Sequence, residues 1–250
     1  MVSFIQGLIL SLVQGITEWF PISSSGHLAI AQQLLGVQDL GFLVYLHFAS
    51  LIAVIILFWN EIIDLFAYKR ISYMVKIIIA IIPAVIAGYL LEKHVRFAFT
   101  SFIFIGIFFM IFGFFIYFTK YAKEIKKNPS IPDAIIIGIA QMFALVPGVS
   151  RSGMTMGSGL ILGLKKSQAI KFSFLLAIPI IFGASLVEAR NINLGGTHFI
   201  TFLTSFTVTL FISLMTIKFL IRIIKSNKFY LFGIYNMILG FLIVLWSLIK

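Results

Sequence analysis

Two short segments place charged, hydroxyl and imidazole side chains inside otherwise apolar sequence. The first reads Gln14-Gly15-Ile16-Thr17-Glu18-Trp19-Phe20-Pro21-Ile22-Ser23-Ser24-Ser25-Gly26-His27. Its carboxylate, three consecutive serines and histidine can act as a base, a nucleophile and a proton carrier. Gln14 and Glu18 are four residues apart, so on a helix they share a face and can bind the same ligand. An alternative is that Glu18 is a helix-end residue whose carboxylate only reaches to water.

The second segment reads Pro147-Gly148-Val149-Ser150-Arg151-Ser152-Gly153-Met154-Thr155 and carries the opposite charge. The planar guanidinium of Arg151 offers five donors that match phosphate oxygens. The flanking glycines let backbone N–H groups approach an anion at the start of a helix. The competing interpretation is an Arg151–Glu18 ion pair that only holds the two segments together. His47, midway along an apolar run, is more typical of a hydrogen-bonded core histidine than of a catalytic one.

The composition shows what surrounds these segments. Of the 250 residues, 61% are apolar and 11% are charged, whereas soluble domains average about 45–50% and 25%. We therefore exclude a soluble enzyme and expect an integral membrane protein. The net charge of +11 does not indicate nucleic acid, because the basic residues are clustered between apolar runs and form no continuous stripe. The absence of cysteine excludes disulfides and thiolate chemistry.

Hydropathy predicts six membrane-spanning helices of about 20 residues. Four runs contain no charged side chain, and two have a lysine near one end that can reach the interface. The six runs are Phe42–Trp59, Met74–Leu91, Phe97–Thr119, Ala169–Val187, Asn191–Ile217 and Phe229–Ile249.

Two further apolar regions, Phe4–Leu35 and Ile135–Leu164, are each broken near the middle by one of the polar segments. Their halves are too short to span, so we predict two re-entrant helix hairpins that line a cavity. A shift of 127 residues places Gln14 on Gln141 and Ser23 on Ser150. The sequence therefore predicts one all-α membrane domain over residues 1–250, built from repeats at about 1–123 and 131–250. Three spans per repeat imply an inverted topology.

Basic residues predict the orientation of the chain. The loops at 60–76, 119–133, 165–171 and 222–228 hold thirteen Lys or Arg, whereas 92–96, 189–197 and the C-terminus hold four. The first set is expected in the cytoplasm. The first hairpin then enters from the outer face and the second from the cytoplasmic face of the plasma membrane, with the site accessible from outside.

Both polar segments, together with Phe172-Ser173-Phe174-Leu175-Leu176-Ala177-Ile178-Pro179, closely resemble the undecaprenyl-diphosphatase family, also called the bacitracin-resistance BacA type. The resemblance covers nearly the whole chain. It implies removal of the terminal phosphate from a polyprenyl diphosphate, which regenerates the lipid monophosphate carrier for cell-wall synthesis. By position, it implies catalytic roles for Glu18, Ser24, His27 and Arg151. We expect contacts to the substrate from Gln14, Ser23, Ser25, Gly148, Ser150, Ser152, Gly153 and Thr155.

The chain departs from the family at Gln14, where a glutamate is usual. The resemblance implies a divalent cation, Mg²⁺ or Ca²⁺, and we expect Glu18 and Gln14 to hold it weakly because an amide carries no charge. Either Ser24 or a water would attack the phosphorus, with His27 exchanging the proton. Two alternative functions for this chain on the same fold are a lipid-phosphate flippase and a non-catalytic binder of diphosphate lipids. The sequence leaves a homodimer open.

Overall fold

The computed structural model describes residues 2–66, 71–99, 101–189 and 197–249. Over these ranges the chain forms eleven α-helices and two short 3-10 helices, without a strand. Six helices are long and apolar enough to cross a membrane. The all-α fold and the six long apolar helices expected from the sequence are therefore confirmed for the described part of the chain.

The six long helices agree with the expected spans, with shifted ends. The start of the span expected from Asn191 lies outside the described residues, and the helix that follows instead continues to Lys225, past Lys218 and Arg222. Long basic side chains near a helix end can extend to water, so they need not terminate the helix. The helices are α3 (Leu40–Leu57), α5 (Ile71–Ala98), α6 (Phe102–Phe118), α9 (Lys166–Ala189), α10 (Phe199–Lys225) and α11 (Leu231–Ile249).

The two broken regions each form a helix, a turn and a second helix. The first contains α1 (Phe4–Thr17) and α2 (Ser24–Leu35), and the second contains α7 (Ile131–Met142), η3 (Phe143–Leu145) and α8 (Arg151–Ile161). Serine side chains define the helix starts, because each accepts a hydrogen bond from a backbone N–H of the first turn. These N-caps are Ser3, Ser23, Ser130 and Ser150.

One helix was not expected. The chain after α3 begins with α4 (Trp59–Phe66), inside the region interpreted as a loop. Its apolar residues Trp59, Ile62, Ile63 and Phe66 follow the i, i+3, i+4, i+7 spacing of one helix face. Trp59, Ile63 and Phe66 are exposed, which suits a short helix lying at a membrane interface.

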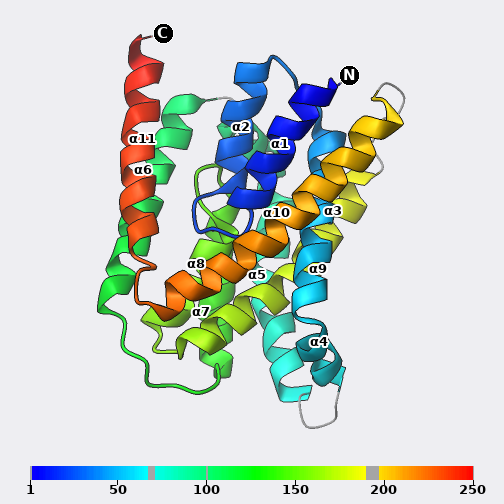
Figure 1. The fold of residues 1–250 in the computed structure, drawn as a ribbon. Coiled ribbons are helices and arrows are strands. Elements are labelled where there is room, and N and C mark those ends of the chain that lie inside the picture. Colours follow the sequence, from blue (N-terminus) through cyan, green and yellow to red (C-terminus); the bar gives the residue numbers. More distant parts are fainter. Residues whose placement is uncertain (1, 67–70, 100, 190–196, 250) are drawn as a thin grey trace.

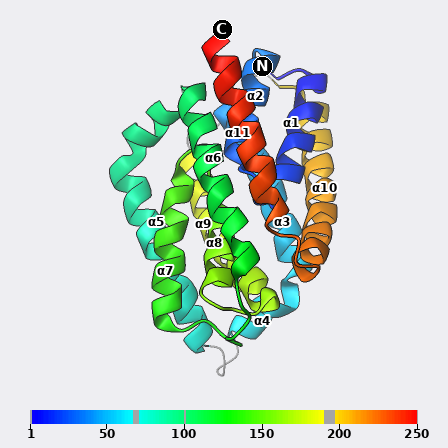
Figure 2. The ribbon, with the colours of Figure 1, turned by 90° about the vertical axis from the view of Figure 1, so that its left-hand side faces the viewer.

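The halves of the chain have matching helix order. A shift of 127 residues carries the first residues of α1 and α2 onto those of α7 and α8, and carries Ile71 of α5 to within one residue of the start of α10. Figures 1 and 2 show α1 and α2 in the upper half of the molecule and α7 and α8 in the lower half. The connections α6–α7, α8–α9 and α10–α11 lie at the lower end in Figure 1, and both chain ends lie at the top.

Helices from different halves pack closely together. The most extensive contacts join α6 with α11, α1 with α10, and α5 with α7, and α6 and α11 run side by side in Figure 2. A Cβ on Gly113 would lie 2.7 Å from the carbonyl oxygen of Gly233, and a Cβ on Gly106 2.8 Å from that of Gly240. The two backbones therefore touch, as is common where small residues line a membrane helix interface.

Candidate functional site

The turns of the two broken regions meet in the interior of the molecule. Ser23 Oγ accepts hydrogen bonds from the N–H groups of Gly148 (3.1 Å) and Gly26 (3.3 Å). Ser23 has a φ of 63°, a left-handed conformation that costs a non-glycine residue about 1–3 kcal/mol and is concentrated at functional sites. Gly148 has a φ of 97°, and a Cβ there would lie 2.6 Å from the carbonyl oxygen of Ile105. Both turns are therefore shaped by contacts across the fold.

Three further serines belong to this junction. Ser150 Oγ and Ser152 Oγ each donate to the carbonyl oxygen of Phe20, at 3.3 and 3.2 Å, and lie 3.0 Å from each other. Ser25 Oγ lies 3.2 Å from Ser23 Oγ. These hydroxyls connect the first turn to the start of α8, where backbone N–H groups remain available to an anion.

Glu18 and Arg151 form an ion pair at the centre of the junction. Arg151 Nη2 donates to Glu18 Oε1 at 2.5 Å, and the two side chains are 14% and 5% exposed. The guanidinium also lies over the ring of Trp19, 5.6 Å from its centroid. The second terminal nitrogen, Arg151 Nη1, is buried and has no hydrogen-bond partner. Because a buried unpaired donor is costly, this nitrogen marks a position that suits an anion.

The other oxygen of Glu18 faces the proposed nucleophile. Ser24 Oγ donates to Glu18 Oε2 at 2.7 Å. The serine hydroxyl is the first side chain of α2, so the turn itself brings it to the carboxylate. This is the geometry of a hydroxyl whose proton can move to a base.

A chain of polar groups continues from the carboxylate into the membrane helices. Gln14 Nε2 donates to Glu18 Oε2 (3.2 Å) and to Ser50 Oγ (3.3 Å), and Ser213 Oγ donates to Ser50 Oγ (3.2 Å). All of these side chains are buried. The sequence analysis missed Ser50 and Ser213, although hydroxyls within a span often form hydrogen bonds between helices. These serines fix Gln14 and through it the carboxylate.

The two histidines differ in position from the expectation. His47 Nε2 lies 3.5 Å from Glu18 Oε2, while its Nδ1 is 2.8 Å from the carbonyl oxygen of Leu43. His27 lies further from the carboxylate: its Nδ1 faces the carbonyl oxygen of Ser23 and its Nε2 faces the hydroxyl of Tyr235, both at 2.8 Å. The ring of Tyr235 also stacks on His27. Thus the histidine at the ion pair is the one interpreted as a core residue.

Two of the expected substrate contacts are engaged inside the protein. Thr155 Oγ1 lies 2.5 Å from Ser173 Oγ and donates to the carbonyl oxygen of Arg151 at 3.0 Å. At Gly153, a Cβ would collide with the ring of Phe112. Both residues therefore have local roles in seating α8, and Ser173 is a partner that the sequence analysis did not identify.

Glu18 and Gln14 are the two side chains that the sequence predicts as ligands of a divalent cation. Within the described ranges no group of three or more His, Asp or Glu side chains is arranged to hold a metal. Glu18 accepts hydrogen bonds from Arg151, Ser24 and Gln14. Gln14 Oε1 is buried without a partner. A carboxylate and an amide oxygen are donor types that a hard cation such as Mg²⁺ or Ca²⁺ prefers.

Comparison with known proteins places this sequence in a family. A family profile described as "Bacitracin resistance protein BacA" matches residues 7–242. A protein of Halothermothrix orenii named "Undecaprenyl-diphosphatase" is 36% identical over 249 residues, which cover 95% of this chain and 96% of the relative. Proteins of Caldicellulosiruptor bescii and Methanococcus vannielii with the same name are 38% and 34% identical. The alignment with the first covers 98% of this chain and 98% of the relative. The alignment with the second covers 96% of this chain and 99% of the relative.

The resemblance drawn from the two polar segments is thereby confirmed. Since the profile covers most of the sequence and the relatives align over nearly their whole length, the chain belongs to the BacA family of bacitracin resistance proteins.

Proposed function

We propose that this chain is an undecaprenyl-diphosphate phosphatase, which hydrolyses the lipid diphosphate to the lipid monophosphate and inorganic phosphate. The names of its relatives support this activity. The observation that carries it is the contact between Ser24 and Glu18, set beside an arginine with one buried and unpaired nitrogen. A transporter needs only the arginine, whereas an enzyme needs the hydroxyl and its base as well.

Arg151 binds the diphosphate. Its Nη2 stays on Glu18 while Nη1 takes an oxygen of the terminal phosphate, so one planar fork fixes the phosphate relative to the carboxylate. With substrate bound, the hydroxyls of Ser150 and Ser152 turn from the carbonyl oxygen of Phe20 to the phosphate. Together with the N–H groups at the start of α8 they complete the oxyanion contacts, and Gly148 allows close approach. In phosphoryl transfer, such positioning and charge neutralisation account for most of the rate enhancement.

Glu18 is the base and Ser24 is the nucleophile in the serine route. As Ser24 Oγ attacks the terminal phosphorus, its proton moves to Glu18 Oε2, and the bond from phosphorus to the bridging oxygen breaks. The leaving lipid monophosphate takes this proton from Glu18, which becomes a carboxylate again. Glu18 then accepts a proton from the water that attacks the phosphoserine and returns it to Ser24 Oγ as inorganic phosphate leaves. In the alternative route, a water in place of Ser24 Oγ makes the attack.

In this scheme His27 positions the start of α2. Through Ser23 and Tyr235 it holds the start of α2, and thus Ser24, in place. Gln14 and Glu18 would hold a divalent cation weakly, and a bound Mg²⁺ or Ca²⁺ would neutralise charge on the phosphate oxygens. All of these groups lie in one chain, so the chemistry requires no homodimer.

The membrane arrangement completes the proposal. The two broken regions are re-entrant hairpins of an inverted repeat, the basic loops face the cytoplasm of a plasma membrane, and the site opens to the outer face. The location of α1–α2 and α7–α8 in opposite halves of the molecule supports this arrangement. The polyprenyl tail remains in lipid while the head group reaches the junction.

The decisive experiment measures phosphate release by purified protein in detergent. We expect release from undecaprenyl diphosphate, a loss of at least 100-fold in Ser24→Ala, and near-normal release in Ser226→Ala, whose hydroxyl only contacts its own helix end. Mass spectrometry of a rapidly quenched reaction should show phosphate on Ser24. Full activity of Ser24→Ala would exclude the covalent route, and no release by the unmodified protein would refute the enzyme.

A further inference from the structure

A polar cavity lies away from the ion pair, toward the lower end of the molecule in Figure 1. Its volume is about 200 Å³. The ends of α6, α8 and α10 and the starts of α9 and α11 form it. Helix α8 begins at Arg151 and contributes Leu160, near its other end, to the cavity wall. A helix of eleven residues is about 16 Å long. The cavity is therefore separate from the candidate active site.

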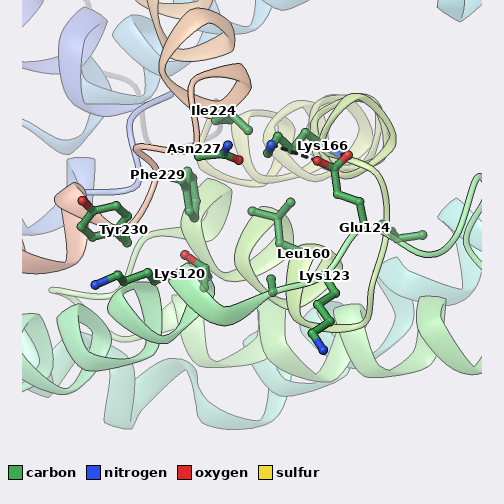
Figure 3. Close-up of a pocket in the computed structure, with 12 residues that line it drawn as sticks. Lys120, Lys123, Glu124, Leu160, Lys166, Ile224, Asn227, Phe229 and Tyr230 are labelled. Carbon is green, nitrogen blue, oxygen red and sulfur yellow. Dashed lines mark hydrogen bonds and ion pairs between the residues drawn. The ribbon is translucent and has the colours of Figure 1, made fainter.

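The charged side chains of the cavity are mostly basic. Lys120, Lys123 and Lys166 line it, together with a single carboxylate, Glu124. Lys166 Nζ lies 2.9 Å from Glu124, and hydrogen bonds from the side chain and backbone of Lys166 lower the pKa of that carboxyl. This pair cancels its own charge, so the net positive charge of the lining comes from Lys120 and Lys123, which are exposed and point outward from the rim of the cavity in Figure 3.

The lysine on the opposite wall is held by aromatic rings. Lys120 Nζ lies 5.5 Å from the ring centroid of Tyr230 and 5.9 Å from that of Tyr117. Figure 3 shows Lys120 and Tyr230 on one side of the cavity and the Lys166–Glu124 pair on the other. Two tyrosines at the ends of membrane helices are typical of the interfacial region of a bilayer.

The remaining wall is apolar. Leu160, Leu164, Ile224 and Phe229 line it, and Asn227 adds an amide that points toward Lys166 in Figure 3. A ligand that fits this surface carries a phosphate beside an apolar portion. Inorganic phosphate matches only the lysines, whereas a phospholipid matches both walls.

We propose that this cavity binds the headgroup of an anionic membrane phospholipid, with the glycerol portion against Leu160 and Phe229 and the lipid phosphate at the rim, where Lys120 and Lys123 supply positive charge from different sides. Basic pockets between membrane helices on the cytoplasmic side recognise lipid headgroups in this way. The site is additional to the diphosphate site and stands whether or not the chain hydrolyses a diphosphate.

The test titrates short-chain phosphatidylglycerol into the purified full-length protein in zwitterionic detergent and measures bound lipid by native mass spectrometry. We compare Lys120→Gln/Lys123→Gln with Lys127→Gln/Lys225→Gln, which removes two exposed lysines that do not line the cavity. Because one lysine near an anionic surface contributes about fivefold, we expect the first variant to bind about 30-fold more weakly. The control should change by less than threefold.

A charge-keeping variant and competing ligands distinguish lipid binding in the cavity from misfolding and from nonspecific attraction. Lys120→Arg/Lys123→Arg keeps both charges and should restore binding, which shows that a loss in the glutamine variant does not come from misfolding. Equal losses in the two glutamine variants would mean a diffuse surface effect and would overturn the proposal. It would also be overturned if inorganic phosphate displaced the lipid at equal concentration, or if the unmodified protein preferred phosphatidylcholine.

Discussion

Replacement of Arg151 by lysine tests whether the central ion pair binds substrate or only joins the two turns. In the structure, Nη2 is paired with Glu18 and Nη1 is buried without a partner. A lysine ammonium is a single point charge, which cannot hold a carboxylate and a phosphate with two parallel donors of one rigid plane. Arg151→Lys should therefore keep the contact to Glu18 and lose the contact to phosphate.

The size of the effect follows from the number of contacts. One hydrogen bond to a charged group contributes about 1.5–3 kcal/mol, and about 1.4 kcal/mol corresponds to a factor of ten in rate. Loss of the Nη1 contact should lower kcat/KM by about 10- to 150-fold. Stability should change little because the buried charge of Glu18 keeps a partner. By contrast, Arg151→Met would leave that carboxylate unpaired and cost about 3–5 kcal/mol.

The assay pairs phosphate release from a polyprenyl diphosphate with thermal unfolding in the same detergent. Arg222→Lys, in the last turn of α10, is the matched control and should leave both measurements unchanged. If Arg151→Lys retained kcat/KM within threefold at normal Tm, the fork would not bind phosphate, and the ion pair would be structural. If activity and Tm fell together in proportion, the loss would be one of folding.

Three further predictions concern neighbouring residues. Gln14→Glu should lower the Mg²⁺ concentration needed for half-maximal phosphate release by at least tenfold, because a second carboxylate joins Glu18; an unchanged metal titration would mean that the amide suffices. His47→Gln should lower kcat/KM about fivefold, as expected for a weak contact to Glu18 of about 1 kcal/mol, with His198→Gln as control; full activity would return His47 to a core role. Gly113→Ala should destabilise the protein by about 1–3 kcal/mol, measured as a lower Tm than in Gly183→Ala, where a Cβ meets no atom within 4 Å. Equal Tm values would show that α6 and α11 separate readily.

Hydropathy and periodicity predicted much of the fold because the bilayer imposes both. A run that must cross hydrocarbon has to be apolar and about 20 residues long, and the six long helices are such runs. Helix ends were less predictable. Lys218 and Arg222 interrupt the apolar pattern, yet α10 continues through them, since basic side chains close to an interface cost little. In α4 the apolar spacing was present but was hidden among the charged residues of an expected loop.

The site was predictable where chemistry requires rare residues. A carboxylate and a guanidinium inside apolar sequence have few stable arrangements other than with each other, and Glu18 and Arg151 do meet. The positions of the two histidines depend on tertiary contacts, which the sequence does not show. His27 follows three serines in sequence, but its Nε2 bonds to Tyr235, which is 208 residues away in the chain. His47 reaches Glu18 from another helix, and no local pattern indicates that approach.

The glycine contacts between α6 and α11 have a consequence for how a long lipid enters the protein. Where two backbones touch at two levels, neither helix can rotate or slide without a clash, so this side of the molecule behaves as a rigid wall. The α1–α10 interface is similar, since a Cβ on Gly7 or Gly15 would lie 2.8 Å from side-chain atoms of α10. By comparison, α2 buries only Gly26 and Leu28 among its own residues. We therefore expect the polyprenyl chain to be admitted by displacement of α2, the helix that begins at Ser24.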